Sequence, residues 1–240
     1  MAYIITILKI RSHLNSLKSV DPGRLPFIDG MAAEETLVEI IPVMFDPSVM
    51  PKRMSQASGT DIVQTSAVNF YENVTQKEVE DFYNAMKDPN DNTPVSYGLN
   101  SKVVKENGVV SEKVWKLGGM YDKAIERIIG WLEKASVVAE NEQQKDIINT
   151  LIEFYKSGSL ETFDDYSVKW VNDTVSQVDF INGFIETYTD PMGMKGSWES
   201  LINFKSIEAS ERTKIISDNA QWFEDNSPID DRFKKEEVKG

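Results

Sequence analysis

Residues 178–199 read VDFINGFIETYTDPMGMKGSWE, and the rest of the chain is organised around this stretch. Its first part, 178–188, is rich in β-branched and aromatic residues, which predicts a strand. Asp190-Pro191 and Gly193 then break the strand, and a second extended run is expected over 197–204. The stretch therefore predicts two extended segments separated by a turn that contains proline and glycine.

Side chains two residues apart share one face of a strand. One predicted face is suited to a core, and it carries Ile181, Gly183 and Ile185. The other carries Phe184, Glu186 and Tyr188, so a carboxylate lies beside a phenol at the end of the strand. Such a pair suits a free amine, because the carboxylate supplies negative charge and the hydroxyl a hydrogen bond. The alternative is that Glu186 and Tyr188 only solvate an edge strand.

The composition excludes several classes of function. The 240 residues carry 26 Lys and Arg against 39 Asp and Glu, a net charge of −13. This surface repels phosphate backbones, so we expect no nucleic-acid partner and a preference for cationic ligands. The chain has no cysteine, which excludes disulfides and thiolate metal sites. Since His13 is its single histidine, a zinc site built from histidines is impossible within this chain.

Residues 1–18 differ from the rest of the sequence. Their apolar residues recur at roughly helical spacing, with basic residues between them. A signal peptide has its basic residues before the apolar run and a small-residue cleavage site after it, and neither is present. The run is also too short to span a membrane. We therefore expect an amphipathic helix with His13 on its surface, no membrane partner and a cytoplasmic location.

Other elements are predicted from caps, turns and spacing. Thr75 to Glu78 form a capping box, so a helix is expected to begin there. Asn107-Gly108 predicts a hairpin, because both residues tolerate a positive φ. Asp61 to Val63 are expected to be extended. Further helices are expected over 34–44, 121–135, 141–155, 160–171 and 207–223. Strands and helices are mixed without βαβ alternation, which indicates an α+β fold.

The segment from Phe184 to Glu199 resembles the stretch of the dipeptidyl peptidase III family that reads F-I-E-S-Y-R-D-P-x-G-x-x-G-x-x-E. Other blocks resemble the same family in the same order: 69–75, 94–102 and 121–141. Residues 20–65 are similar to its bacterial, Bacteroides-like branch. The resemblance covers about 19–240, and residues 1–18 do not share it.

The resemblance implies a two-lobed zinc peptidase that releases dipeptides from the N-termini of short peptides. In the family, the zinc ligands lie in an H-E-x-x-G-H motif and a further glutamate on the catalytic lobe, and this chain lacks that motif. We therefore expect a fragment that binds no metal itself and is inactive alone, with zinc present in the complete enzyme. Its partners would be short peptides and the absent catalytic lobe. In the family, the positions matching Glu186 and Tyr188 hold the free amino terminus of the substrate, so the resemblance implies this role for both residues.

The same resemblance predicts how the chain is divided. Residues 1–18 would be an unmatched leader, and 19–206 a lower-lobe domain that anchors substrate, with helices and a small β-barrel or antiparallel sheet. Residues 207–240 would be a helix and a connector toward the catalytic lobe. Asp190 is expected to shape the turn rather than to bind substrate. Two alternatives stay open: a stand-alone peptide-binding or regulatory module without catalytic activity, and a scaffold without a ligand.

Overall fold

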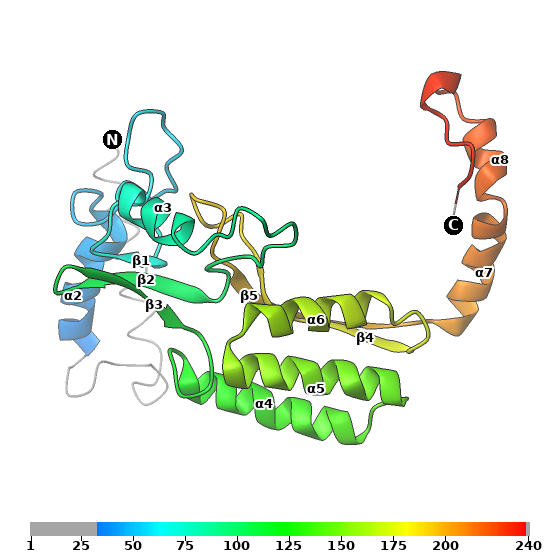
Figure 1. The fold of residues 1–240 in the computed structure, drawn as a ribbon, viewed down its shortest axis with the longest axis horizontal. Helices are drawn as coiled ribbons and strands as arrows, with labels where there is room; N and C mark the ends of the chain where they lie inside the picture. The colour runs from blue at the N-terminus through cyan, green and yellow to red at the C-terminus, as the bar shows by residue number, and fades with distance from the viewer. Residues whose placement is uncertain (1–32, 239–240) are drawn as a thin grey trace. The chain divides into compact units, whose positions relative to one another are not determined.

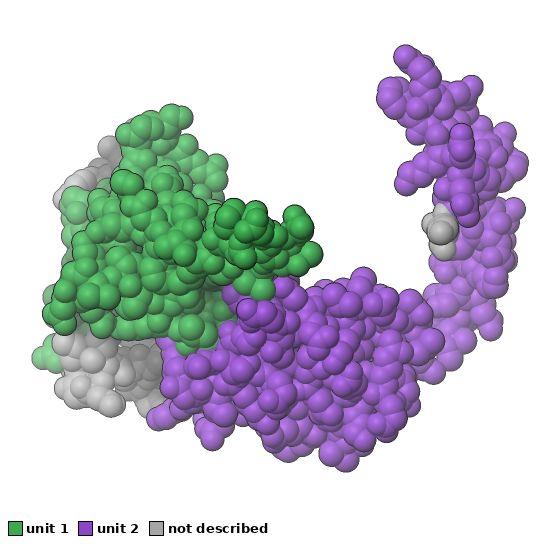
Figure 2. Space-filling model, in the orientation of Figure 1, with its two compact units in different colours: residues 1–115, 186–197 green, residues 116–185, 198–240 purple. Residues whose placement is uncertain are grey.

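The computed structural model describes residues 33–238, and the expected helix over 1–18 lies outside them. Helices alternate irregularly with two small sheets, so the predicted α+β class is confirmed (Figure 1). The chain divides into two compact units (Figure 2). Unit 1 comprises residues 1–115 and 186–197, and unit 2 comprises 116–185 and 198–240.

Unit 1 is built on a three-stranded sheet in the order β1-β2-β3. Its elements are α2 (Ala33–Phe45), β1 (Tyr71–Glu72), α3 (Gln76–Asn84), β2 (Ser101–Glu106) and β3 (Val109–Val114). Strand β1 pairs with β2 in parallel, and β2 pairs with β3 in an antiparallel ladder. The core of the unit is a cluster of five buried side chains: Val63, Val74, Val79, Tyr83 and Val103.

Two local predictions in unit 1 are confirmed. Thr75 accepts a hydrogen bond from the backbone of Glu78, whose carboxylate accepts one in return from the Thr75 backbone, which completes the capping box of α3. Asn107 and Gly108 have φ values of 51° and 82° and join β2 to β3 as a tight hairpin. Both features depend on neighbouring residues only, which is why the sequence reveals them.

Unit 2 contains three helices that pack in succession: α4 (Asp122–Val137), α5 (Glu142–Ser157) and α6 (Leu160–Val171). The central helix, α5, buries the largest apolar face: Ile147, Ile148, Leu151, Ile152, Phe154 and Tyr155. The remaining elements are β4 (Val178–Glu186), β5 (Ser197–Phe204), α7 (Ile207–Asp218), α8 (Ala220–Asp225) and the 3-10 helix η2 (Asp231–Phe233). Within residues 33–238, no helix is both long and apolar enough to cross a membrane.

Strands β4 and β5 form a second, two-stranded sheet. The backbone N–H of Lys205 donates to the carbonyl of Gln177 at 2.8 Å, and the side chains of Asn182 and Ser200 are 3.3 Å apart. Residues advance along one strand as they recede along the other, so the pair is antiparallel. The expected antiparallel sheet is therefore present, while the described strands close no barrel.

Two predicted extended segments are corrected by the structure. Residues 61–63 form a turn, because the carboxylate of Asp61 accepts hydrogen bonds from the backbone N–H groups of Val63 and Gln64. The strand expected over 178–188 ends at Glu186, two residues early. Tyr188 consequently lies in the turn that follows β4.

Candidate functional site

The end of β4 is held by aromatic side chains on both faces. A Cβ atom added to Gly183 would lie 2.9 Å from the ring of Phe163, so this backbone lies directly against α6. Phe184 is only 5% exposed, and its ring meets that of Tyr155 edge to face at 6.4 Å. The expectation that Phe184 shares an open face with Glu186 is therefore wrong, because α5 covers the Phe184 side. This packing fixes β4 as far as Phe184.

The two predicted site residues both belong to unit 1 and follow this packed strand. Glu186 is the last residue of β4 and is partly exposed, while Tyr188 lies in the turn and is 72% exposed. Among residues 33–238, neither side chain has a hydrogen-bonding or ion-pair partner. Within this part of the chain, a carboxylate and a phenol two residues apart thus remain unpaired.

The turn itself is organised by Asp190, which is 3% exposed. Its carboxylate accepts hydrogen bonds from the backbone N–H groups of Met192 at 3.2 Å, Met194 at 2.9 Å and Lys195 at 2.9 Å. It also accepts the phenol of Tyr71 at 2.8 Å, which ties the turn to β1. Asp190 therefore shapes the turn, as predicted, and its oxygens are occupied by the protein.

Tyr71 was not predicted as part of this region. Burial, and next the negative charge of Asp190, raise the pKa of the Tyr71 phenol far above its ordinary value, so the phenol stays a donor. Tyr71 and Asp190 are 119 positions apart. Neither the spacing nor the composition of the sequence links them, and only their membership of two family-like blocks points to a shared role.

Lys195 is the second residue that the sequence does not reveal. It stands in the turn between Met194 and Gly196 and is 0% exposed, although lysine is among the residues least often buried. Its ammonium group lies beside α3 and β2, where Tyr83 and Ser101 accept hydrogen bonds from it. A sequence pattern would place this lysine at the surface.

The metal that the resemblance implies has no fitting ligand set in the described part of the chain. A zinc site needs three or four side chains from histidine, cysteine, aspartate or glutamate in one place. Residues 33–238 contain no group of three or more such side chains that could hold a metal ion.

The profile of peptidase family M49 matches residues 50–240. The chain belongs to peptidase family M49. Its relatives include dipeptidyl peptidase 3 of Dictyostelium discoideum, which is 32% identical over 118 residues, or 49% of this chain and 17% of that protein. Dipeptidyl peptidase 3 of Homo sapiens is 28% identical over 118 residues, which cover 49% of this chain and 16% of the human protein.

A solved structure has a similar fold. The dipeptidyl peptidase III of Caldithrix abyssi superimposes with a TM-score of 0.56 at 20% sequence identity. The superposition covers 95% of this chain and 40% of that chain. The match to the curated relatives spans only about a sixth of their length, 16–17%.

Proposed function

We propose that this chain is part of a zinc-dependent exopeptidase resembling dipeptidyl peptidase III, which releases dipeptides from the N-termini of short peptides. In this proposal the chain supplies the anchor for the substrate's amino terminus and is inactive alone. Membership of family M49 and the relatives named dipeptidyl peptidase 3 support the peptidase activity. The cytoplasmic location expected from the sequence is part of this proposal.

One observation carries the anchoring role. Glu186 is partly and Tyr188 largely exposed, and neither has a partner among residues 33–238, while Asp190 holds the turn that follows Glu186 and contains Tyr188. Unpaired polar groups on a fixed backbone are prepared for a ligand, because binding does not first break an internal contact. The Glu186 carboxylate would bind the ammonium group, and the Tyr188 hydroxyl would accept or donate one hydrogen bond.

Holding the amino terminus explains how a dipeptide would be measured. An extended peptide advances about 3.3–3.6 Å per residue, so the second peptide bond lies on the order of 7 Å from the first nitrogen. A fixed anion at the first nitrogen therefore sets which bond is presented for cleavage. The cleavage itself would depend on the zinc-binding part of the longer relatives.

The test is a calorimetric titration of the chain with a tetrapeptide and with its N-acetylated twin. Acetylation removes the positive charge and leaves the rest of the peptide unchanged. We expect the free-amine peptide to bind at least about tenfold more tightly, which corresponds to roughly 1.4 kcal/mol. Equal affinities would exclude an anchor for the amino terminus and would favour a scaffold without this ligand.

A further inference from the structure

The ammonium group of Lys195 is fully engaged inside unit 1. Its three N–H donors meet the hydroxyl oxygen of Tyr83, the backbone carbonyl of Gly98 at 3.0 Å and the hydroxyl oxygen of Ser101 at 3.0 Å. These acceptors come from α3, from the loop before β2 and from β2 itself. The side chain thus joins the turn that follows β4 to three separate parts of the unit.

Among the described residues, one carboxylate, that of Glu112, lies within ion-pair distance of this buried charge. The hydroxyl groups of Tyr83 and Ser101 both donate to Glu112, the first at 2.6 Å, and the Glu112 oxygen is 3.8 Å from the Lys195 nitrogen. The ring of Tyr83 adds a cation–π contact, with its centroid 4.7 Å from the same nitrogen. A buried ammonium without such partners would be strongly unfavourable. The network therefore stabilises the turn only while all of its members are in place.

The loop before β2 is shaped around the same ammonium group. Gly98 has a φ of +84°, and a Cβ atom placed on it would lie 2.5 Å from the Tyr83 hydroxyl and 2.8 Å from the Lys195 nitrogen. The next residue, Leu99, accepts a hydrogen bond from the backbone of Gly196 at 2.8 Å. Only glycine leaves room here for the Lys195 side chain to reach its partners.

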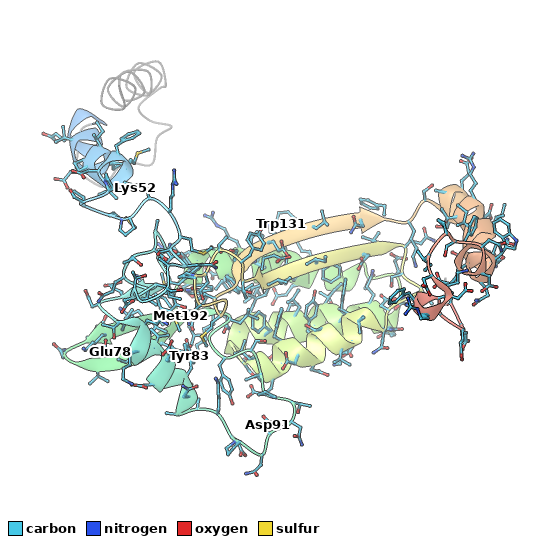
Figure 3. The ribbon with its side chains drawn as sticks, turned by 90° about the horizontal axis from the view of Figure 1, so that it is seen from above. Lys52, Glu78, Tyr83, Asp91, Trp131 and Met192 are labelled. Atoms are coloured by element: carbon cyan, nitrogen blue, oxygen red, sulfur yellow. The ribbon has the colours of Figure 1, made fainter. Side chains whose placement is uncertain are left out.

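The turn is thus fixed at two separate points. Asp190 ties its first half to Tyr71, and Lys195 with Gly196 ties its second half to α3, β2 and the loop before β2. Met192 and Met194, between these points, pack against the core cluster of unit 1, whose member Tyr83 is labelled near Met192 in Figure 3. The open residues Glu186 and Tyr188 precede the first of these points.

We propose that Lys195 is a positioning residue that fixes the turn over 187–196 and thereby sets where Glu186 and Tyr188 meet a peptide's amino group. Lys195 itself touches no substrate, because it is completely buried. The fixing of the turn follows from the network alone, and its effect on peptide binding rests on the proposed function.

The experiment compares Lys195→Met with Val79→Ala. The first variant removes the ammonium group and keeps an unbranched apolar side chain. The second weakens the same core at a residue that is 0% exposed and takes no part in the turn. Hydrogen exchange is followed in the turn and in α3, and calorimetry gives the affinities for the tetrapeptide and its N-acetylated twin.

In Lys195→Met we expect exchange in the turn to accelerate by about tenfold or more relative to α3. The selectivity for the free amine over the N-acetylated peptide should fall by roughly tenfold to a hundredfold, since small displacements of a binding group have effects of this size. Val79→Ala should accelerate exchange in both segments alike and keep the selectivity within about twofold.

Equal behaviour of the two variants would overturn the proposal, because Lys195 would then be only one more core residue. If the wild-type chain does not distinguish the two peptides, the proposed function fails, and the exchange comparison alone decides whether Lys195 fixes the turn. Should Lys195→Met not fold, Lys195→Met/Glu112→Met removes both charges and leaves none unpaired. This double variant must show the same selective loosening of the turn.

Discussion

Two acidic side chains only four positions apart have opposite environments. Asp190 is buried and accepts hydrogen bonds from three backbone N–H groups and from the Tyr71 phenol. Glu186 is partly exposed and has no such partner among the described residues. An acidic residue whose oxygens are already occupied organises structure, whereas one whose oxygens are free is available to a cationic ligand. This difference is why Asp190 organises the turn, while the proposal places the amine at Glu186.

The hydroxyl of Tyr188 should make a smaller contribution than the carboxylate of Glu186. We expect Tyr188→Phe to weaken binding of the free-amine tetrapeptide by roughly 0.5–1.5 kcal/mol, the usual scale for a neutral hydrogen bond. Calorimetry measures this loss. Tyr97→Phe serves as the control, since the Tyr97 hydroxyl donates to the Met86 carbonyl, at 3.3 Å, within the described part of the chain. An identical loss of affinity for the N-acetylated peptide would show that the Tyr188 hydroxyl does not bind the amino group.

Lys195 makes the stability of unit 1 depend on pH. Burial lowers the pKa of its ammonium from 10.5 to about 8, although the charges of Glu112 and Asp190 oppose this shift. Between these values the unfolded chain binds more protons than the folded one. The free energy of unfolding therefore rises as the pH is raised from 8 toward 10.5. The stability gained in this way is present above pH 10.5 and is lost as the pH falls through 8.

We expect the free energy of unfolding to rise by roughly 1–3 kcal/mol between pH 8 and 10 because of Lys195. Burial raises the pKa values of Tyr71 and Tyr83 well above 10, so their stabilising contribution is lost only as pH rises beyond 10. Urea unfolding at pH 8, 9 and 10 measures the rise. Lys195→Met should have a flatter profile, and identical profiles for the two proteins would contradict this account.

At the scale of elements, the features that could be predicted from the sequence are those set by residues close together in the chain. The capping box at Thr75, the hairpin at Asn107-Gly108 and the helices α4, α5 and α6 are confirmed, since each depends on contacts within one element or one turn. The single helix predicted over 207–223 is wrong, because the structure breaks it at Asn219 into α7 and α8. The strand end at Glu186 was misplaced because Thr187 and Tyr188 have high β-propensity. The Asp190 hydrogen bonds close the turn that follows and override this propensity.

The contacts that fix the candidate site could not be predicted in this way. Tyr71 and Asp190 are 119 positions apart, and Lys195 and Tyr83 are 112 apart. Such pairs are brought together by the packing of whole elements, and their residue types carry no periodic signal. The sequence therefore indicated Glu186 and Tyr188 through family resemblance, while the residues that support their backbone required the structure.

The loop before β2 offers a matched pair of glycine substitutions. Gly98 and Gly108 have similar φ values, +84° and +82°, but a Cβ atom on Gly108 has nothing within 4 Å. We expect Gly108→Ala to destabilise the chain by about 1–2 kcal/mol through backbone strain alone. Gly98→Ala should cost at least about 2 kcal/mol more, because it also displaces Tyr83 and Lys195. Urea unfolding of both variants provides the comparison. Equal losses of unfolding free energy would show that Tyr83 and Lys195 can move aside without destabilising the chain.

At the scale of the whole molecule, the chain is an M49 member whose match covers a small part of its relatives. The M49 profile spans residues 50–240, yet the curated relatives are covered over only 16–17% of their length. The predicted α+β class holds, although the described strands form two separate sheets instead of a barrel. The division into 1–18, 19–206 and 207–240 stays a prediction.

We expect the chain by itself neither to bind stoichiometric zinc nor to release dipeptides. No group of candidate ligands occurs within residues 33–238, and the single histidine of the sequence is His13. Metal analysis after dialysis against zinc and an assay with a chromogenic dipeptidyl substrate test both points. Turnover that a chelator abolishes would contradict the proposal that catalysis needs a further part of the enzyme.

The most direct measurement combines a change in the protein with a change in the ligand. Wild type, Glu186→Gln and the control Glu133→Gln, an exposed carboxylate on α4, are each titrated with the tetrapeptide and its N-acetylated twin. We predict that Glu186→Gln weakens binding of the free amine by roughly 2–5 kcal/mol, the scale for removing one partner of a desolvated charge pair, and abolishes the selectivity. Glu133→Gln should retain it. Undiminished selectivity in Glu186→Gln would contradict the central claim that this carboxylate holds the amino terminus of a peptide.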